Sequence, residues 1–108
     1  MSERMVRQFM EMVRIDSESG NEARFMEYLL GEASALGARA ALDGYGNLIA
    51  AFPAKGASTT GPILLSCHGD TVKPGVGIEP VLGSDGVIRS GGDTILGADD
   101  KAGIAEVL

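Results

Sequence analysis

An uninterrupted apolar run over residues 63–67 constrains the fold of this chain more than any other stretch. The run has the sequence ILLSC and leads directly into His68, the only histidine of the chain. Continuous rather than alternating apolar residues are typical of a strand that other layers cover on both faces. We therefore expect a central strand that delivers His68 to one edge of a sheet.

The composition is that of a globular chain with an acidic balance. Of its 108 residues, 44% are hydrophobic and 22% are charged, which is far from the composition of disordered chains. We expect a single domain over residues 1–108, because this length lies within the usual size of one domain. Nine basic and fifteen acidic residues give a net charge of -6, so no nucleic-acid partner is expected.

The N-terminus leads straight into an amphipathic pattern and does not resemble a signal peptide. No apolar run approaches the length that crosses a membrane, so no membrane partner is expected. A single cysteine, Cys67, cannot form an internal disulfide, and this agrees with a reducing compartment. We expect a cytoplasmic protein.

The remaining patterns predict helices and hairpins around the expected central strand. Apolar residues recur at helical spacing around 6–13 and again over 21–36, where Gly37 stands at the position of a left-handed C-cap. The other expected elements are strands over 39–42 and 47–52, an exposed connection over 55–62, a hairpin over 79–82 and 87–90, and a helix over 102–108. Because this last pattern is still helical at residue 108, we expect the chain to be the N-terminal part of a larger protein.

Two short segments carry the candidate chemistry. His68 and Asp70 are two residues apart, so on an extended strand their side chains point to the same side. An imidazole that binds a metal typically gives its other ring nitrogen to a carboxylate. Asp99, followed by Asp100, stands in a glycine-flanked turn before a helix and offers a further carboxylate. A second interpretation stays open: His68 is an ordinary half-buried histidine, Asp70 a turn residue and Asp99 a helix N-cap.

Three other features indicate no separate chemistry. Gly75 and Gly77 are not followed by the third glycine of a dinucleotide-binding loop, and the chain contains no phosphate-binding loop of the Gly-Lys-Ser/Thr type. Cys67 lacks a histidine partner of its own for a nucleophilic dyad, so we expect a small core residue there. Lys101 is expected to be solvated or paired with an acidic side chain.

Two segments taken together, SCHGDTVKPG at 66–75 and TILGADDKAG at 94–103, resemble the peptidase T-like (tripeptidase) branch of the zinc aminopeptidase, aminoacylase and carboxypeptidase G superfamily. The resemblance covers nearly the whole chain, through two initial helices, the loop at 17–19 and the strand that begins at 46–48. It implies an α/β fold, in which this chain is the N-terminal segment of a zinc-peptidase domain with a mixed central sheet flanked by helices. The lid or dimerisation domain and the remaining strands would lie outside the chain.

The resemblance also implies roles for individual residues. His68 would ligate one metal ion, and Asp99 would bridge two zinc ions, with cobalt or manganese as substitutes. Asp70 would be the catalytic residue that orients His68, and a cis peptide bond would join Asp99 to Asp100. The general base and the other ligands would lie outside this chain, so the chain alone is expected to be inactive.

The implied activity is metal-dependent hydrolysis of short peptides with release of the N-terminal residue. An alternative on the same di-zinc site is an N-acyl amino acid deacylase or a related amidohydrolase. An alternative of another class is a non-catalytic binding or assembly module that retains the fold. The expected partners are a short peptide substrate and a second copy of the protein, in a homodimer formed through a domain outside this chain.

Overall fold

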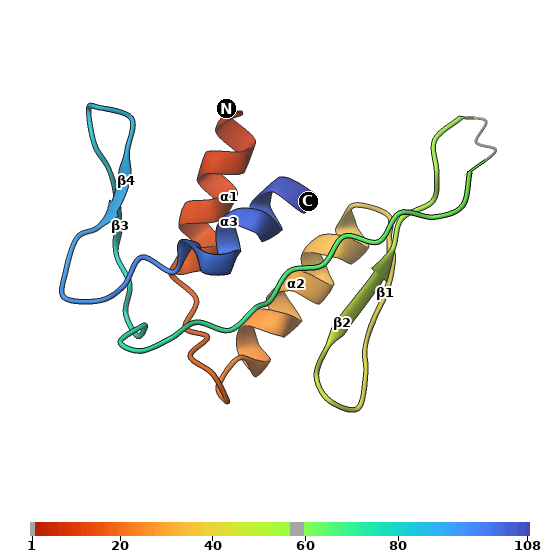
Figure 1. The fold of residues 1–108 in the computed structure, drawn as a ribbon, viewed down its shortest axis with the longest axis horizontal. Helices are drawn as coiled ribbons and strands as arrows, with labels where there is room; N and C mark the ends of the chain where they lie inside the picture. Colours follow the sequence, from red (N-terminus) through yellow and green to blue (C-terminus); the bar gives the residue numbers. More distant parts are fainter. Residues whose placement is uncertain (1, 57–59) are drawn as a thin grey trace. The chain divides into compact units, whose positions relative to one another are not determined.

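The structure is a computed structural model and describes residues 2–56 and 60–108. Within these residues it contains three helices and two two-stranded antiparallel sheets (Figure 1). The chain divides into two compact units, Met1–Phe25 with Cys67–Leu108 and Met26–Ser66. Each unit contains its own hairpin.

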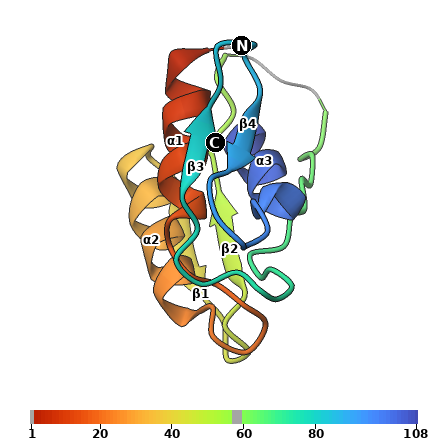
Figure 2. The same ribbon diagram turned by 90° about the vertical axis from the view of Figure 1, so that its left-hand side faces the viewer.

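The first unit is built on α1 (Glu3–Val13) and α3 (Ala98–Val107), which lie side by side (Figures 1 and 2). Helix α1 begins after Ser2, whose hydroxyl accepts a hydrogen bond from the amide of Met5 at 3.1 Å. The buried apolar side chains of this unit are Phe9, Met12, Val13, Phe25, Ile78, Ile104 and Ala105. This core fixes the start of α3, where one of the candidate site residues lies.

A short hairpin completes the first unit. Strand β3 (Pro80–Leu82) pairs antiparallel with β4 (Ile88–Ser90). The turn between them is closed by Asp85, whose carboxylate accepts the amide of Val87 at 3.1 Å. The expected hairpin is confirmed, with each strand shorter at one end.

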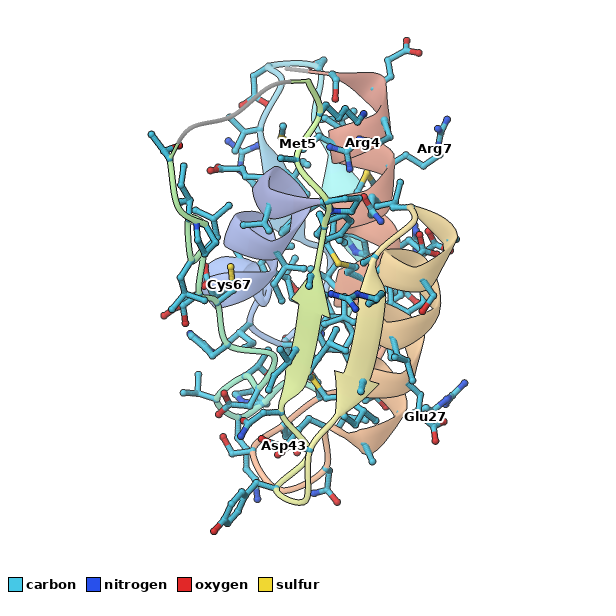
Figure 3. The ribbon with its side chains drawn as sticks, turned by 90° about the vertical axis from the view of Figure 1, so that its right-hand side faces the viewer. Arg4, Met5, Arg7, Glu27, Asp43 and Cys67 are labelled. Carbon is cyan, nitrogen blue, oxygen red and sulfur yellow. The ribbon has the colours of Figure 1, made fainter. Side chains whose placement is uncertain are left out.

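The second unit contains most of α2 (Ala23–Ala35) and the antiparallel pair β1 (Arg39–Leu42) and β2 (Leu48–Ala51). Leu29 and Ala33, four residues apart on α2, form its buried face. Gly37 follows the helix with a φ of 94°, the left-handed C-cap that its position predicts. Asp43 directly follows β1 and lies where the turn between β1 and β2 begins (Figure 3).

The expected central strand over residues 63–67 is wrong for this structure. The segment forms no strand and pairs with no other part of the described chain. Ile63 and Leu64 are 86% and 90% exposed, and Cys67 is exposed rather than a core residue. A strand is stabilised by backbone hydrogen bonds to its neighbours, and an apolar run does not supply that partner. The mixed central sheet flanked by helices is therefore not formed by the described residues.

Two remaining points concern membrane-spanning helices and the connection before residue 63. Within the part of the chain that the structure describes, no helix is both long and apolar enough to cross a membrane. The exposed connection expected over 55–62 includes residues 57–59, which lie outside the described residues.

Candidate metal centre

The site forms where the turn after residue 67 faces the start of α3. Nε2 of His68 lies 2.9 Å from Oδ1 of Asp99. On the other side of the ring, Nδ1 lies 3.1 Å from Oδ1 of Asp70 and 3.0 Å from the Asp70 carbonyl oxygen. The three residues proposed from the sequence are thus brought together, with the imidazole held between two carboxylates.

The backbone at the start of α3 directs Asp99 toward this ring. Gly97 precedes the helix with a φ of 83°, a left-handed conformation that glycine adopts without strain. Asp99 and Asp100 depart from helical backbone angles, and the peptide bond between them is cis, as the family resemblance implies. The side chain of Asp99 is 95% exposed, so it remains accessible to a ligand while it contacts His68.

Hydrogen bonds set the protonation of the site. The pKa of His68 is raised, above all by the hydrogen bond with Asp99 and also by those with Asp70. The pKa of Asp70 is lowered, chiefly because the hydroxyl of Ser19 donates to its Oδ2 at 2.5 Å. Both shifts stabilise the charged form of each side chain relative to the same side chain free in water.

An open cavity of about 360 Å³ adjoins these groups. Its lining comprises His68, Asp70, Thr71, Val72 and the segment from Ile95 to Asp99. The imidazole and both carboxylates contribute the charged groups of this lining, and the rest is mainly apolar. Such a mixture of a few polar groups in an apolar cleft is typical of a small-molecule site.

The candidate ligands are of the types that zinc binds, but they are fewer than a catalytic zinc site requires. An imidazole nitrogen and a carboxylate oxygen are ordinary zinc ligands, and a carboxylate behind the second ring nitrogen is the usual support of a metal-binding histidine. Catalytic zinc normally takes three protein ligands. Over residues 2–56 and 60–108, no group of three or more His, Cys, Asp or Glu side chains is arranged to hold a metal ion. His68 and Asp99 could therefore supply part of a metal site.

Neighbouring residues differ from their expected roles. Lys101 is fully buried rather than solvated, and its ammonium donates to the carbonyl of Ile15 at 2.8 Å. The pKa of the Cys67 thiol is raised, first by partial desolvation and second by the Asp100 carboxylate. Ser19 was missed as a site residue because its contact with Asp70 spans 51 positions of the chain. The sequence indicated only the loop at 17–19, to which Ser19 belongs, as part of the family resemblance.

The fold and the site together define a chain related to part of the peptidase T metallopeptidases. Two solved structures match it closely. They are a tripeptidase from Staphylococcus aureus, at 38% identity and a TM-score of 0.84, and the aminopeptidase PepT from Bacillus cereus, at 42% identity and a TM-score of 0.91. The matches cover 96% and 97% of this chain, and the chain spans 30% of each of those structures.

Sequence comparison agrees with the structural match. The uncharacterized protein YqjE of Bacillus subtilis aligns with this chain at 41% identity over 113 positions. The alignment covers 97% of this chain and 30% of that protein. No protein-family model matches the chain. The resemblance to the peptidase T-like branch is confirmed over this 30% share of its relatives.

Proposed function

We propose that the protein is a zinc-dependent aminopeptidase of the tripeptidase type, which releases the N-terminal residue of short peptides. One observation supports this most strongly: Nε2 of His68 lies 2.9 Å from the Asp99 carboxylate while Asp70 contacts Nδ1. This arrangement occurs in a chain that is 42% identical to the matching part of the aminopeptidase PepT. The activity itself belongs to that relative and is carried over here as a proposal.

Each residue of the site has a proposed role. His68, through Nε2, and Asp99, through its carboxylate, would help to hold the zinc of a two-ion site. Asp70 accepts a hydrogen bond from Nδ1 of His68, which would leave the lone pair of Nε2 for the metal. Zinc at such a site supplies Lewis-acid activation of water and of the scissile carbonyl. The general base and the further ligands are proposed to lie in a part of the protein outside this chain.

The surroundings of the site agree with a small substrate. The open cavity of about 360 Å³ lies at the low end of the volumes that small-molecule sites enclose. We propose a short peptide as the substrate, a cytoplasmic location, and a homodimer formed through a domain outside the chain. This chain alone is proposed to be inactive, because two ligands are fewer than catalytic zinc requires.

Hydrolysis assays on the intact protein test the proposal. A tripeptide and an N-acetylated amino acid are offered separately, each with and without a chelator and then with added zinc. We expect the tripeptide to be hydrolysed, the chelator to abolish the reaction and zinc to restore it. Hydrolysis of the acylated amino acid alone would instead support the deacylase, and no hydrolysis of either substrate would support a binding module.

A matched pair of variants relates the activity to the site. Asp70→Asn removes the negative charge behind Nδ1, and we expect kcat to fall about 10- to 100-fold. Asp93→Asn makes the same chemical change at an exposed position whose carboxylate does not line the cavity, and should leave activity unchanged. Equal activity of the two variants would contradict the role given to Asp70.

A further inference from the structure

The loop that precedes α2 is joined to the turn that carries the site. Backbone hydrogen bonds run from the amide of Thr71 to the carbonyl of Ser17 at 2.9 Å and from the amide of Ser19 to the carbonyl of Thr71 at 3.1 Å. Two further bonds, from the amides of Gly75 and Gly77 to the carboxylates of Glu18 and Asp16, each measure 2.9 Å. The backbone of Ser19 is therefore fixed beside Asp70 by contacts that do not involve its own side chain.

The hydroxyl of Ser19 lies against the carboxylate of Asp70. Its Oγ donates to Oδ2 of Asp70 at 2.5 Å, whereas its distance to the carbonyl of Thr71 is 3.4 Å. A hydroxyl has one proton to donate, and the shorter contact takes it. Oδ1 of the same carboxylate faces Nδ1 of His68. Each oxygen of Asp70 thus has its own partner, which prevents the carboxylate from rotating freely.

Packing alone does not hold the imidazole of His68 in place. Its side chain is 51% exposed, so few neighbouring atoms oppose rotation of the ring. Rotation of the ring by half a turn would exchange Nδ1 with Cδ2 and Nε2 with Cε1, and would remove Nδ1 from Asp70 and Nε2 from Asp99. The contacts of Nδ1 with Asp70 and of Nε2 with Asp99 therefore hold the orientation of the ring, and the orientation of the Asp70 carboxylate depends on Ser19.

We propose that Ser19 is a positioning residue for the metal centre: its hydroxyl holds the Asp70 carboxylate so that Oδ1 faces Nδ1 of His68 and Nε2 faces Asp99. The relevance of Ser19 to catalysis rests on the function proposed above. The effect of Ser19 on the imidazole of His68 does not depend on that function, because the contacts are present without a metal. The serine touches neither the ring nor Asp99, and it acts only through Asp70.

The test begins with the protein without metal. His68 is the only histidine of this chain, so in a nitrogen-15 NMR spectrum of the 108-residue chain its ring nitrogens are identified without ambiguity. Ser19→Ala should lower the fraction of neutral imidazole that carries its proton on Nδ1. Ser19→Thr keeps a hydroxyl and should retain the original fraction.

Ser17→Ala is the matched control. The hydroxyl of Ser17 is buried and has no hydrogen-bond partner among the described residues, so its loss should leave the imidazole spectrum unchanged. A spectrum that is the same in Ser19→Ala as in the original protein would overturn the proposal. So would an equal change in Ser17→Ala. If Ser19→Ala does not fold, as judged by circular dichroism, Ser19→Cys makes the same comparison with a weak donor of similar size.

Zinc titration of the intact protein is the second measurement. Loss of a group that holds a metal-binding histidine typically lowers metal affinity about 10- to 100-fold, and Ser19 acts one contact further away. We therefore expect Ser19→Ala to weaken zinc binding by about tenfold or less, with Ser19→Thr and Ser17→Ala unchanged. If the original protein binds no zinc while the imidazole still responds to Ser19→Ala, the proposed function fails and the role of Ser19 stands.

Discussion

At the scale of single residues, Lys101 shows how the start of α3 is anchored. Its buried Nζ donates to the carbonyl of Ile15 at 2.8 Å and lies 4.3 Å from the centre of the Phe25 ring. Lys101→Met keeps the aliphatic length and leaves that carbonyl without its donor. We expect the free energy of unfolding to fall by about 1 to 3 kcal/mol, as measured by urea denaturation. Lys55→Met, at an exposed position, should change it by about 0.5 kcal/mol or less.

The same lysine gives a pH dependence. Burial lowers the pKa of Lys101 to about 8 from the ordinary 10.5. Between these two values the unfolded chain binds more protons at this residue than the folded chain, so its contribution makes stability rise with pH. Urea denaturation at several pH values should show a rise between about pH 8 and 10.5 in the original protein. The rise should be smaller in Lys101→Met, and an identical pH profile of the two proteins would contradict the burial of a protonatable amine.

Gly97 is a second residue whose identity the backbone dictates. Its φ of 83° is left-handed, and a Cβ there would lie 3.4 Å from Ile78 and 3.6 Å from Thr71. Gly97→Ala should lower the free energy of unfolding by about 1 to 2 kcal/mol in denaturation experiments. Gly92→Ala, where a Cβ meets no atom within 4 Å, is the control. Equal stability of the two variants would show that the turn before α3 does not require glycine.

Residue types and the family resemblance together selected three residues of the candidate site and missed a fourth. His68, Asp70 and Asp99 could be selected because imidazole and carboxylate groups have a limited set of roles at such spacings, and the resemblance made the selection sharper. Ser19 could not, because a serine hydroxyl forms hydrogen bonds in many contexts and its partner lies 51 positions away. The burial of Lys101 was also missed, since a charged side chain next to a helix start is usually solvated.

At the scale of elements, the β1–β2 hairpin depends on Asp43. Its carboxylate accepts the amides of Tyr45 and Asn47 at 2.8 and 2.9 Å and the side-chain amide of Asn47 at 3.0 Å. These bonds lower the pKa of Asp43, with the Asn47 side chain as the largest cause. Carboxyl carbon NMR should give a pKa below the ordinary 3.8 and a higher value in Asn47→Ala.

The sign of the linked stability follows from that direction. Because the folded-state pKa of Asp43 is lowered, its contribution is complete above the ordinary value of 3.8 and is lost as the pH falls through the folded-state value. Amide exchange in β1 and β2 should therefore accelerate at low pH more than can be explained by the chemistry of exchange alone. An unchanged pKa in Asn47→Ala would contradict the hydrogen bonds assigned to this turn.

Helices and hairpins were predictable because their determinants are local. Apolar spacing gave α1 and α2, Gly37 marked the end of α2, and turn residues gave both hairpins. The strand expected over 63–67 failed for the opposite reason. Its backbone partners must come from another strand, and the described residues contain none that pairs with it.

At the scale of the whole molecule, the chain corresponds to a minor part of the relatives that it matches. It spans 30% of the tripeptidase and of the aminopeptidase PepT that it matches. Its two candidate ligands, His68 and Asp99, contact each other. Asp70 contacts the other ring nitrogen of His68, and Ser19 donates a hydrogen bond to Asp70. The remaining ligands and the general base must come from another part of the protein if the proposed function is correct.

The most direct test is an anomalous-scattering experiment at the zinc edge on crystals of the intact protein grown with zinc. We expect a zinc ion bonded to Nε2 of His68 and to the carboxylate of Asp99, with Nδ1 still facing Asp70. Added zinc should replace the direct contact between Nε2 and Asp99 without rearranging the ring. A crystal in which zinc is absent from this site, or is bound through Nδ1, would contradict the account.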